Sequence, residues 1–181
     1  MKKSFLILSL VAMSAMAFAQ TRKTTSATVS FDATTSKDAL PKADNKTVVG
    51  EVNTKTGEIG FEAAVKNFAF TNEMIQNHFN GEKWMNSAKF PVFTFMGKIT
   101  DLSKVKFDKP GTYTVPVSGE LTIRDVTKPL STTATFEVKA GSLTASSSFS
   151  IKLADYGITG APIEAGKIAP EPKITVSAEL K

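Results

Sequence analysis

The chain has 181 residues, with no cysteine, a single histidine and 22 basic against 17 acidic side chains. Without cysteine it can form no disulfide, no thiolate nucleophile and no cysteine-based metal site, and one histidine is too few for the usual transition-metal centre. The positive charge is mild and its lysines are scattered, which is typical of solvated strand faces rather than of a nucleic-acid surface.

Residues 1–19 have the composition of a secretory signal peptide. Lys2 and Lys3 form a charged start, residues 5–18 are almost wholly apolar, and residues 17–19 read Ala-Phe-Ala, the small-x-small pattern that precedes cleavage. The apolar stretch is too short for the alternative, a membrane anchor. We expect cleavage before Gln20, a periplasmic or secreted protein without a stable membrane anchor, and one domain over residues 20–181.

Eight segments of the mature chain alternate apolar and polar residues with period two, which predicts strands with one face on a core and one in water. The clearest runs from Tyr113 to Ile123, where the odd positions are mostly apolar and the even positions mostly polar. Glycine and proline fall between the runs, where they predict turns. The predicted strands cover residues 27–31, 48–52, 59–65, 93–99, 113–123, 134–138, 143–153 and 174–180.

Residues 71–87 break this alternation and predict one short helix. Met74, His78 and Phe79 recur at helical spacing on one face. A side chain at position 71 or 72 can cap the start of the helix, and Gly81 can end or interrupt it.

The expected architecture is all-β, an eight-stranded antiparallel barrel with one short helical segment, and a sandwich is the alternative. A barrel in an outer membrane would alternate in the same way. However, one tryptophan and two tyrosines are too few for its two aromatic girdles. We therefore expect a soluble barrel.

The chain has few groups for catalysis. His78 lies beside Phe79 on the apolar face of the predicted helix, where a lone histidine is more often a packing or rim residue than a catalyst. We therefore predict a protein that is not an enzyme and that uses no metal and no cofactor.

The inferred inward face mixes bulky and small residues, which leaves two interpretations open. Phe93 and Phe95 alternate with small residues such as Gly97, Gly119 and Ala134. The rings can fill the space beside the small residues and give a densely packed core. Alternatively, that space is an apolar cavity, as in eight-stranded barrels that carry ligands.

Three segments resemble motifs of the YceI-like family. Residues 79–95 are similar to its helix-to-strand signature, S-x-x-[FY]-P-x-x-x-F, and residues 119–130 to its hairpin, G-x-L-T-I-x-G-V-T-K-P-V. Residues 149–158 are similar to its segment F-x-[IL]-x-x-x-D-[FY]-G-I. Asp125 stands where the family often has glycine, a change that a left-handed turn tolerates. Residues 20–70 match the family only in strand pattern.

The resemblance implies a lipocalin-like barrel in an exported protein that encloses an isoprenoid-type lipid, as a carrier or for sequestration, with the polar head at the mouth. The competing hypothesis is a non-enzymatic structural or protein-interaction barrel with a solid core. Neither hypothesis involves nucleic acid, and the oligomeric state stays open. The predicted ligand-binding residues of the barrel interior and portal are Phe61, Met74, Phe79, Trp84, Phe93, Phe95, Val117, Leu121, Phe136 and Phe149. The predicted head-group contacts are His78, Lys83, Arg124 and Lys128.

Overall fold

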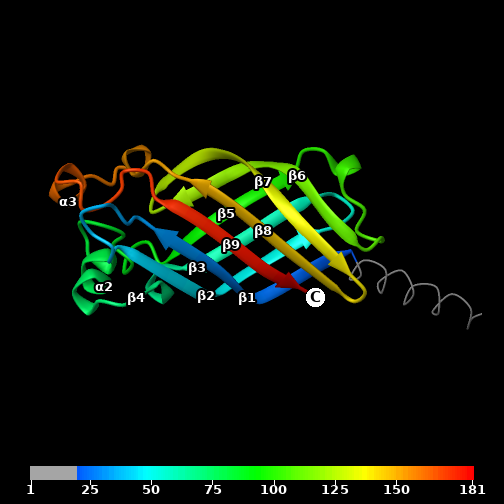
Figure 1. Ribbon diagram of the computed structural model, residues 1–181, viewed down its shortest axis with the longest axis horizontal. Coiled ribbons are helices and arrows are strands. Elements are labelled where there is room, and N and C mark those ends of the chain that lie inside the picture. The colour runs from blue at the N-terminus through cyan, green and yellow to red at the C-terminus, as the bar shows by residue number, and fades with distance from the viewer. Residues whose placement is uncertain (1–19) are drawn as a thin grey trace, which may run out of the picture.

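The chain folds into a β-barrel with helices at one end (Figure 1). A computed structural model describes residues 20–181, and the predicted signal peptide lies outside the described residues. The strands are β1 (Thr21–Asp32), β2 (Lys42–Asn53), β3 (Glu58–Ala64), β4 (Ala69–Phe70), β5 (Val92–Ile99), β6 (Gly111–Ile123), β7 (Val126–Lys139), β8 (Ser142–Ser150) and β9 (Lys173–Leu180). The helices are α2 (Glu73–Asn80) and α3 (Ala161–Glu164), with the 3-10 turns η1 (Val65–Asn67), η2 (Leu102–Lys104) and η3 (Leu153–Tyr156).

Eight of the strands close into a ring. Neighbours pair in the order β1-β9-β8-β7-β6-β5-β3-β2, and β1 also pairs with β2. The pairings are antiparallel throughout. The predicted eight-stranded antiparallel barrel is confirmed, and the sandwich alternative is wrong. The two residues of β4 pair with β2 beside the ring.

Strand β2 begins at Lys42, whereas the sequence predicted a strand only from residue 48. Asn45 obscured the pattern because a polar residue here occupies a fully buried position. Its Nδ2 donates to the carbonyl oxygen of Ala64 at 2.9 Å, and its Oδ1 accepts from the backbone N–H of Thr47 at 2.9 Å. These bonds satisfy the buried amide and tie β2 to the end of β3.

Two further elements differ from the prediction. Strand β8 ends at Ser150 rather than at residue 153, because the backbone turns into η3, which Gly157 ends at a left-handed φ of 68°. Helix α3 was not predicted, since four residues are too few to show a helical period.

Helix α2 is shorter than the predicted segment and is capped by Asn72. The Asn72 Oδ1 accepts hydrogen bonds from the backbone N–H groups of Met74 at 2.9 Å and Ile75 at 3.2 Å. These bonds satisfy donors that the first helical turn leaves free. Helices α2 and α3 lie at one end of the barrel, here the helical end, and the C terminus lies at the other, here the terminal end (Figure 1).

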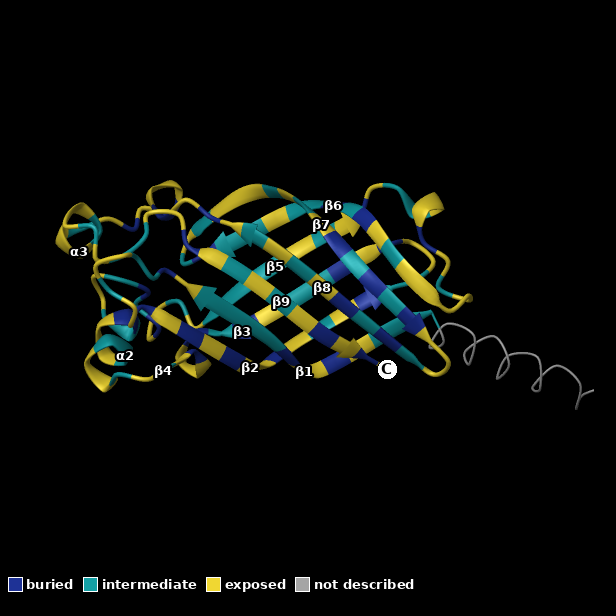
Figure 2. Cartoon of the chain, viewed as in Figure 1, coloured by how far each residue is buried: buried dark blue, intermediate teal, exposed yellow. Residues whose placement is uncertain are grey.

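Burial of the inward residues varies along the barrel (Figure 2). Toward the terminal end, inward residues such as Val115 and Leu180 are fully buried. Toward the helical end, Phe93, Leu121 and Phe149 are only half-buried although they face the interior. An inward side chain keeps accessible surface only where the interior holds empty space. The barrel is therefore packed in one part and hollow in the other, so each of the two interpretations of the interior applies to part of it.

Candidate ligand-binding site

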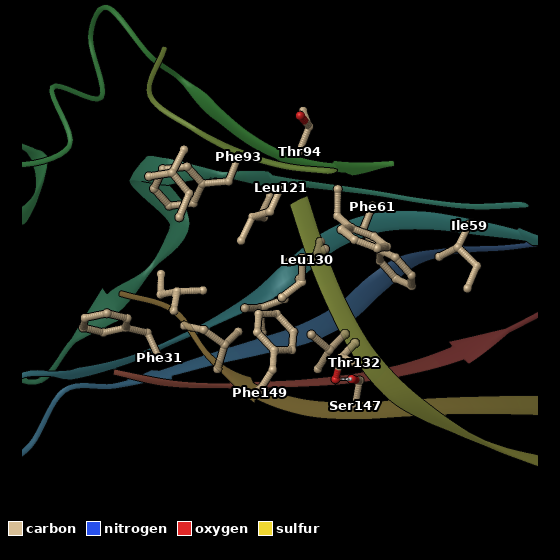
Figure 3. Close-up of a pocket in the computed structure, with 18 of the residues that line it drawn as sticks. Phe31, Ile59, Phe61, Phe93, Thr94, Leu121, Leu130, Thr132, Ser147 and Phe149 are labelled. Carbon is tan, nitrogen blue, oxygen red and sulfur yellow. Dashed lines mark hydrogen bonds between the residues drawn. The ribbon is translucent and has the colours of Figure 1, made fainter. Parts of the chain in front are cut away.

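An apolar lumen occupies the hollow part of the barrel (Figure 3). Its volume is about 160 Å³. The polar residues of the lining are Thr94, Thr132, Ser146 and Ser147, and all others are apolar. The site is therefore suited to hydrocarbon rather than to a charged ligand.

All of the predicted interior residues except Met74 and Trp84 line this lumen. They come from five strands and from α2, and Figure 3 shows several of them around one common space. The residues that line it are Phe61, Phe79, Phe93, Phe95, Val117, Leu121, Phe136 and Phe149.

The two exceptions lie elsewhere around the helical end. Met74 is 67% exposed on α2 and borders a shallow surface depression with His78. Trp84 is partly buried against the core in the loop after α2, and its neighbour Met85 lines the lumen instead. Sequence periodicity could not predict that Met85 rather than Trp84 lines the lumen, because the helix ends at Asn80 and the loop that follows it has no periodic pattern.

A cluster of aromatic rings closes the helical end of the lumen. The Phe79 ring lies 4.9 Å from that of Phe70, 5.9 Å from Phe68 and 6.2 Å from Phe31, measured between centroids. Such tilted contacts suit the quadrupoles of the rings. Phe31 and Phe68 also line the lumen but were not among the predicted site residues. Period-two alternation indicates that Phe31 faces inward, whereas Phe68 lies between strands where no pattern applies.

Glycines let one interior ring lie flat against the wall. Gly97 and Gly119 face each other across β5 and β6. A Cβ on Gly97 would come within 2.7 Å of the Phe95 ring, and one on Gly119 within 2.9 Å of the same ring. Of the two interpretations that the sequence left open, the first therefore applies at these positions: the Phe95 ring fills the space beside the two glycines, and the lumen stays open beside the ring.

Strands β7 and β8 diverge at Ala134 and Ser147, and we call this point in the barrel wall the fork. The two strands pair only from Ala134–Ser147 to Lys139–Ser142, so the first half of β7 has no β8 partner. At the end of the ladder the Ser147 Oγ donates to the carbonyl oxygen of Thr133 at 2.7 Å and lies 3.3 Å from the Thr132 Oγ1. These two hydroxyls form a small polar spot in the apolar lining, drawn in Figure 3.

The predicted head-group contacts do not form one cluster. His78 and Lys83 are exposed on α2 and in the loop after it, and Lys128 is exposed on the unpaired half of β7. Arg124 lies in the β6–β7 hairpin, half-buried, with its guanidinium carbon 5.6 Å from the centroid of the Phe90 ring. Within residues 20–181 its Nε is buried without a hydrogen-bond partner.

Arg124 also adopts the left-handed conformation of the hairpin. Its φ is 59°, and among the described residues only Asn86 shares a positive φ without being glycine. The sequence assigned this conformation to Asp125, one residue too late. The hairpin therefore tolerates aspartate where the family often has glycine because the strain falls on the preceding residue.

Two side chains near the helical end have shifted pKa values. Hydrogen bonds from the side chain and backbone of Thr34 hold the pKa of the Asp32 carboxyl below its usual 3.8. Burial raises the pKa of the Tyr156 phenol above its usual 10.0, with a smaller contribution from the charge of Asp155. Both groups therefore keep their ordinary charge states at neutral pH.

Residues 20–181 contain no group of three or more histidine and carboxylate side chains placed to hold a metal ion. Over the same residues no helix is long and apolar enough to cross a membrane.

The fold is an eight-stranded antiparallel barrel with an apolar lumen, which makes it a lipocalin-like barrel. The YceI-like domain family matches residues 12–180, and the chain belongs to this family. No curated protein sequence matches the chain.

Solved structures share the fold at low identity. A polyisoprenoid-binding domain from Saccharophagus degradans, implicated in plant cell wall breakdown, is 16% identical with a TM-score of 0.74 and covers 90% of this chain and 98% of its own. BcnA from Burkholderia cenocepacia is 18% identical with a TM-score of 0.70 over 86% of this chain and 96% of its own. A Campylobacter jejuni YceI protein is 20% identical with a TM-score of 0.54 over 75% of this chain and 81% of its own.

Proposed function

We propose that the protein is an exported carrier that encloses the apolar tail of an isoprenoid-type lipid in the barrel lumen. The observation that carries this proposal is the hollow, phenylalanine-lined space toward the helical end. Burying about 200 Å² of tail there would contribute roughly 5 kcal/mol to binding. The polyisoprenoid-binding description of the S. degradans domain supports the choice of ligand class.

The polar head of the lipid lies at the fork in this proposal. Thr132 and Ser147 supply hydroxyls there. Lys128 pairs with Leu121 across β6 and β7, and directly opposed residues of antiparallel strands point to the same face of the sheet. Leu121 lines the lumen, so Lys128 lies on the lumen side of β7 where that strand has no β8 partner. A cation at this position suits an anionic or strongly polar head.

Extraction of the purified protein with organic solvent, followed by mass spectrometry, tests the proposal. We expect a prenyl lipid in stoichiometric amount. Ala134→Trp places a large ring in the lumen and should abolish the lipid load, whereas Thr133→Trp, on the exposed face of the same strand, should leave it unchanged. A folded Ala134→Trp protein that keeps its full load would contradict a lumen site.

A lipid-free extract from protein made in several bacterial hosts would favour the competing hypothesis of a structural or interaction module. A carrier should in addition move a labelled prenyl lipid between vesicles faster than the spontaneous rate.

A further inference from the structure

On the β7–β8 side the lumen ends inside the barrel, whereas on β2 and β3 its lining continues to Val52 and Ile59. On β7 the lining stops after Phe136, and the next inward residue, Val138, is buried outside the lumen. On the neighbouring strand β8 it stops at Ala145, and the next inward residue, Leu143, is likewise buried outside it. Because Phe136 and Ala145 are cross-strand partners, the lumen ends at the same depth on both strands.

Phe136 is the largest side chain at this boundary. It is 1% exposed although it lines the lumen, so its ring is packed on its other sides. Phe107, from the segment between η2 and β6 that covers the terminal end, packs edge-on behind it, with centroids 5.4 Å apart and planes at 78°. On this side of the barrel the two rings together separate the lumen from the packed side chains behind them.

We propose that Phe136 sets the greatest length of apolar tail that the lumen accepts. This inference rests on the proposed function, with the free end of the tail directed toward the terminal end. A tail that fills the lumen meets the Phe136 ring, and the dense packing behind the ring prevents a further advance. Each additional isoprene unit then stays outside the lumen in water, where it gains no burial. Longer lipids should therefore bind no more tightly than the longest one that fits.

The test uses a mixture of linear polyprenols that differ by one isoprene unit, offered in equal amounts to the delipidated protein. Mass spectrometry of the retained lipid gives the preferred length. Phe136→Ala should shift this length upward by one isoprene unit, because the lost phenyl ring and an isoprene unit contain nearly the same number of carbon atoms. Phe136→Leu should shift it in the same direction by less.

A change in the opposite direction provides a second, independent measurement. Ala145→Leu adds bulk at the same depth on β8 and should shift the preferred length downward. Val138→Ala is the matched control, since it removes buried volume from the next inward position of β7 without touching the lumen. Its length profile should equal that of the unmodified protein.

The outcomes separate this inference from the proposed function. In one outcome, the unmodified protein retains polyprenols and the Phe136 and Ala145 variants show the same length profile as the unmodified protein. This outcome would overturn the role of Phe136 but leave the proposed function standing. An unmodified protein that retains no polyprenol of any length would overturn both. A shift in Val138→Ala as large as that in Phe136→Ala would assign the effect to general loosening and would also overturn the inference. If Phe136→Ala does not fold, the Phe136→Leu and Ala145→Leu variants decide the question.

Discussion

The ring of Phe61 occupies the place where residue 50 would carry its β-carbon. The two residues are cross-strand partners on β2 and β3, and a Cβ built on Gly50 would collide with the Phe61 ring. Glycine at position 50 thus lets the ring lie back against the wall. Phe95 uses Gly97 and Gly119 in the same way on β5 and β6. The lumen stays open because these rings rest on backbone instead of projecting inward.

Gly50→Ala should push the Phe61 ring into the lumen. We expect a loss of about 1–3 kcal/mol in the free energy of unfolding from overpacking, together with a reduced lipid load. Urea titration and lipid mass spectrometry on the same preparation measure both effects. Gly60→Ala is the control, since its Cβ would meet only flexible side chains, the end of Met96 with its sulfur at 3.3 Å and the Glu51 Cγ at 3.9 Å. Equal lipid loads in the two variants would contradict this account of the Phe61 ring.

The packed and hollow parts of the barrel should respond differently to the same substitution. Phe136→Ala should lower the free energy of unfolding by about 3–5 kcal/mol, as expected for a fully buried ring. Phe149→Ala should lower it by less, because that ring is only half-buried and so makes fewer contacts that the substitution would remove. The difference between the two urea midpoints of lipid-free protein is the measurement. A larger loss at Phe149 would mean that the lumen is filled by side chains in solution.

Asn45→Ala should destabilise the barrel by about 1–3 kcal/mol, because it leaves the Ala64 carbonyl oxygen without its side-chain donor at a buried site. Asn67→Ala serves as the control. Its Nδ2 donates to the Thr47 Oγ1 at 2.7 Å in an exposed position, so its loss should change stability by no more than about 0.5 kcal/mol. Thermal unfolding should show a larger loss of stability in Asn45→Ala than in Asn67→Ala. A larger loss in Asn67→Ala would contradict the role of Asn45 in linking β2 to β3.

The hydrogen bonds of the Asp32 carboxylate should make the free energy of unfolding fall at acidic pH. Its carboxylate accepts from the Thr34 backbone N–H at 3.0 Å and hydroxyl at 2.7 Å, which holds its pKa below 3.8 in the folded state. The stabilisation is therefore present above pH 3.8 and is lost as the pH falls through the lower folded value. In Asp32→Asn this part of the pH dependence should vanish. Melting temperatures of the two proteins are measured from neutral pH to pH 2. If both proteins lose the same amount of thermal stability in acid, Asp32 contributes nothing to the pH dependence.

Hydrogen exchange should distinguish the two halves of β7. Residues 126–133 pair with β6 alone, whereas residues 134–138 pair with both β6 and β8. A strand segment that is paired on one side alone opens at a lower free energy than one paired on both sides. The amides of the first half should therefore exchange faster. Bound lipid should slow the exchange of the first half, if its head lies at the fork. Uniform exchange along β7 would mean that the fork is closed in solution.

Period-two alternation was enough to predict the ring of eight strands and the inward direction of Phe93, Phe95 and Phe149. It could not predict whether the interior is hollow, because the space left by Gly119 depends on where the Phe95 ring lies, and that ring belongs to another strand. Alternation also could not predict that Met85, rather than the expected Met74, lines the lumen. This placement follows from where α2 ends and how the next loop folds back, and neither leaves a periodic signal.

The division of the barrel into a packed and a hollow part separates two properties that many small binding proteins must balance. Residues such as Val115 and Leu180 lie outside the lumen and hold the strands together, whereas Leu121 and Leu130 border the empty space. Mutations in the second group can change which molecule fits while the fold keeps its main source of stability. Ligand preference in this scaffold can therefore drift, or be redesigned, without a matching loss of thermal resistance.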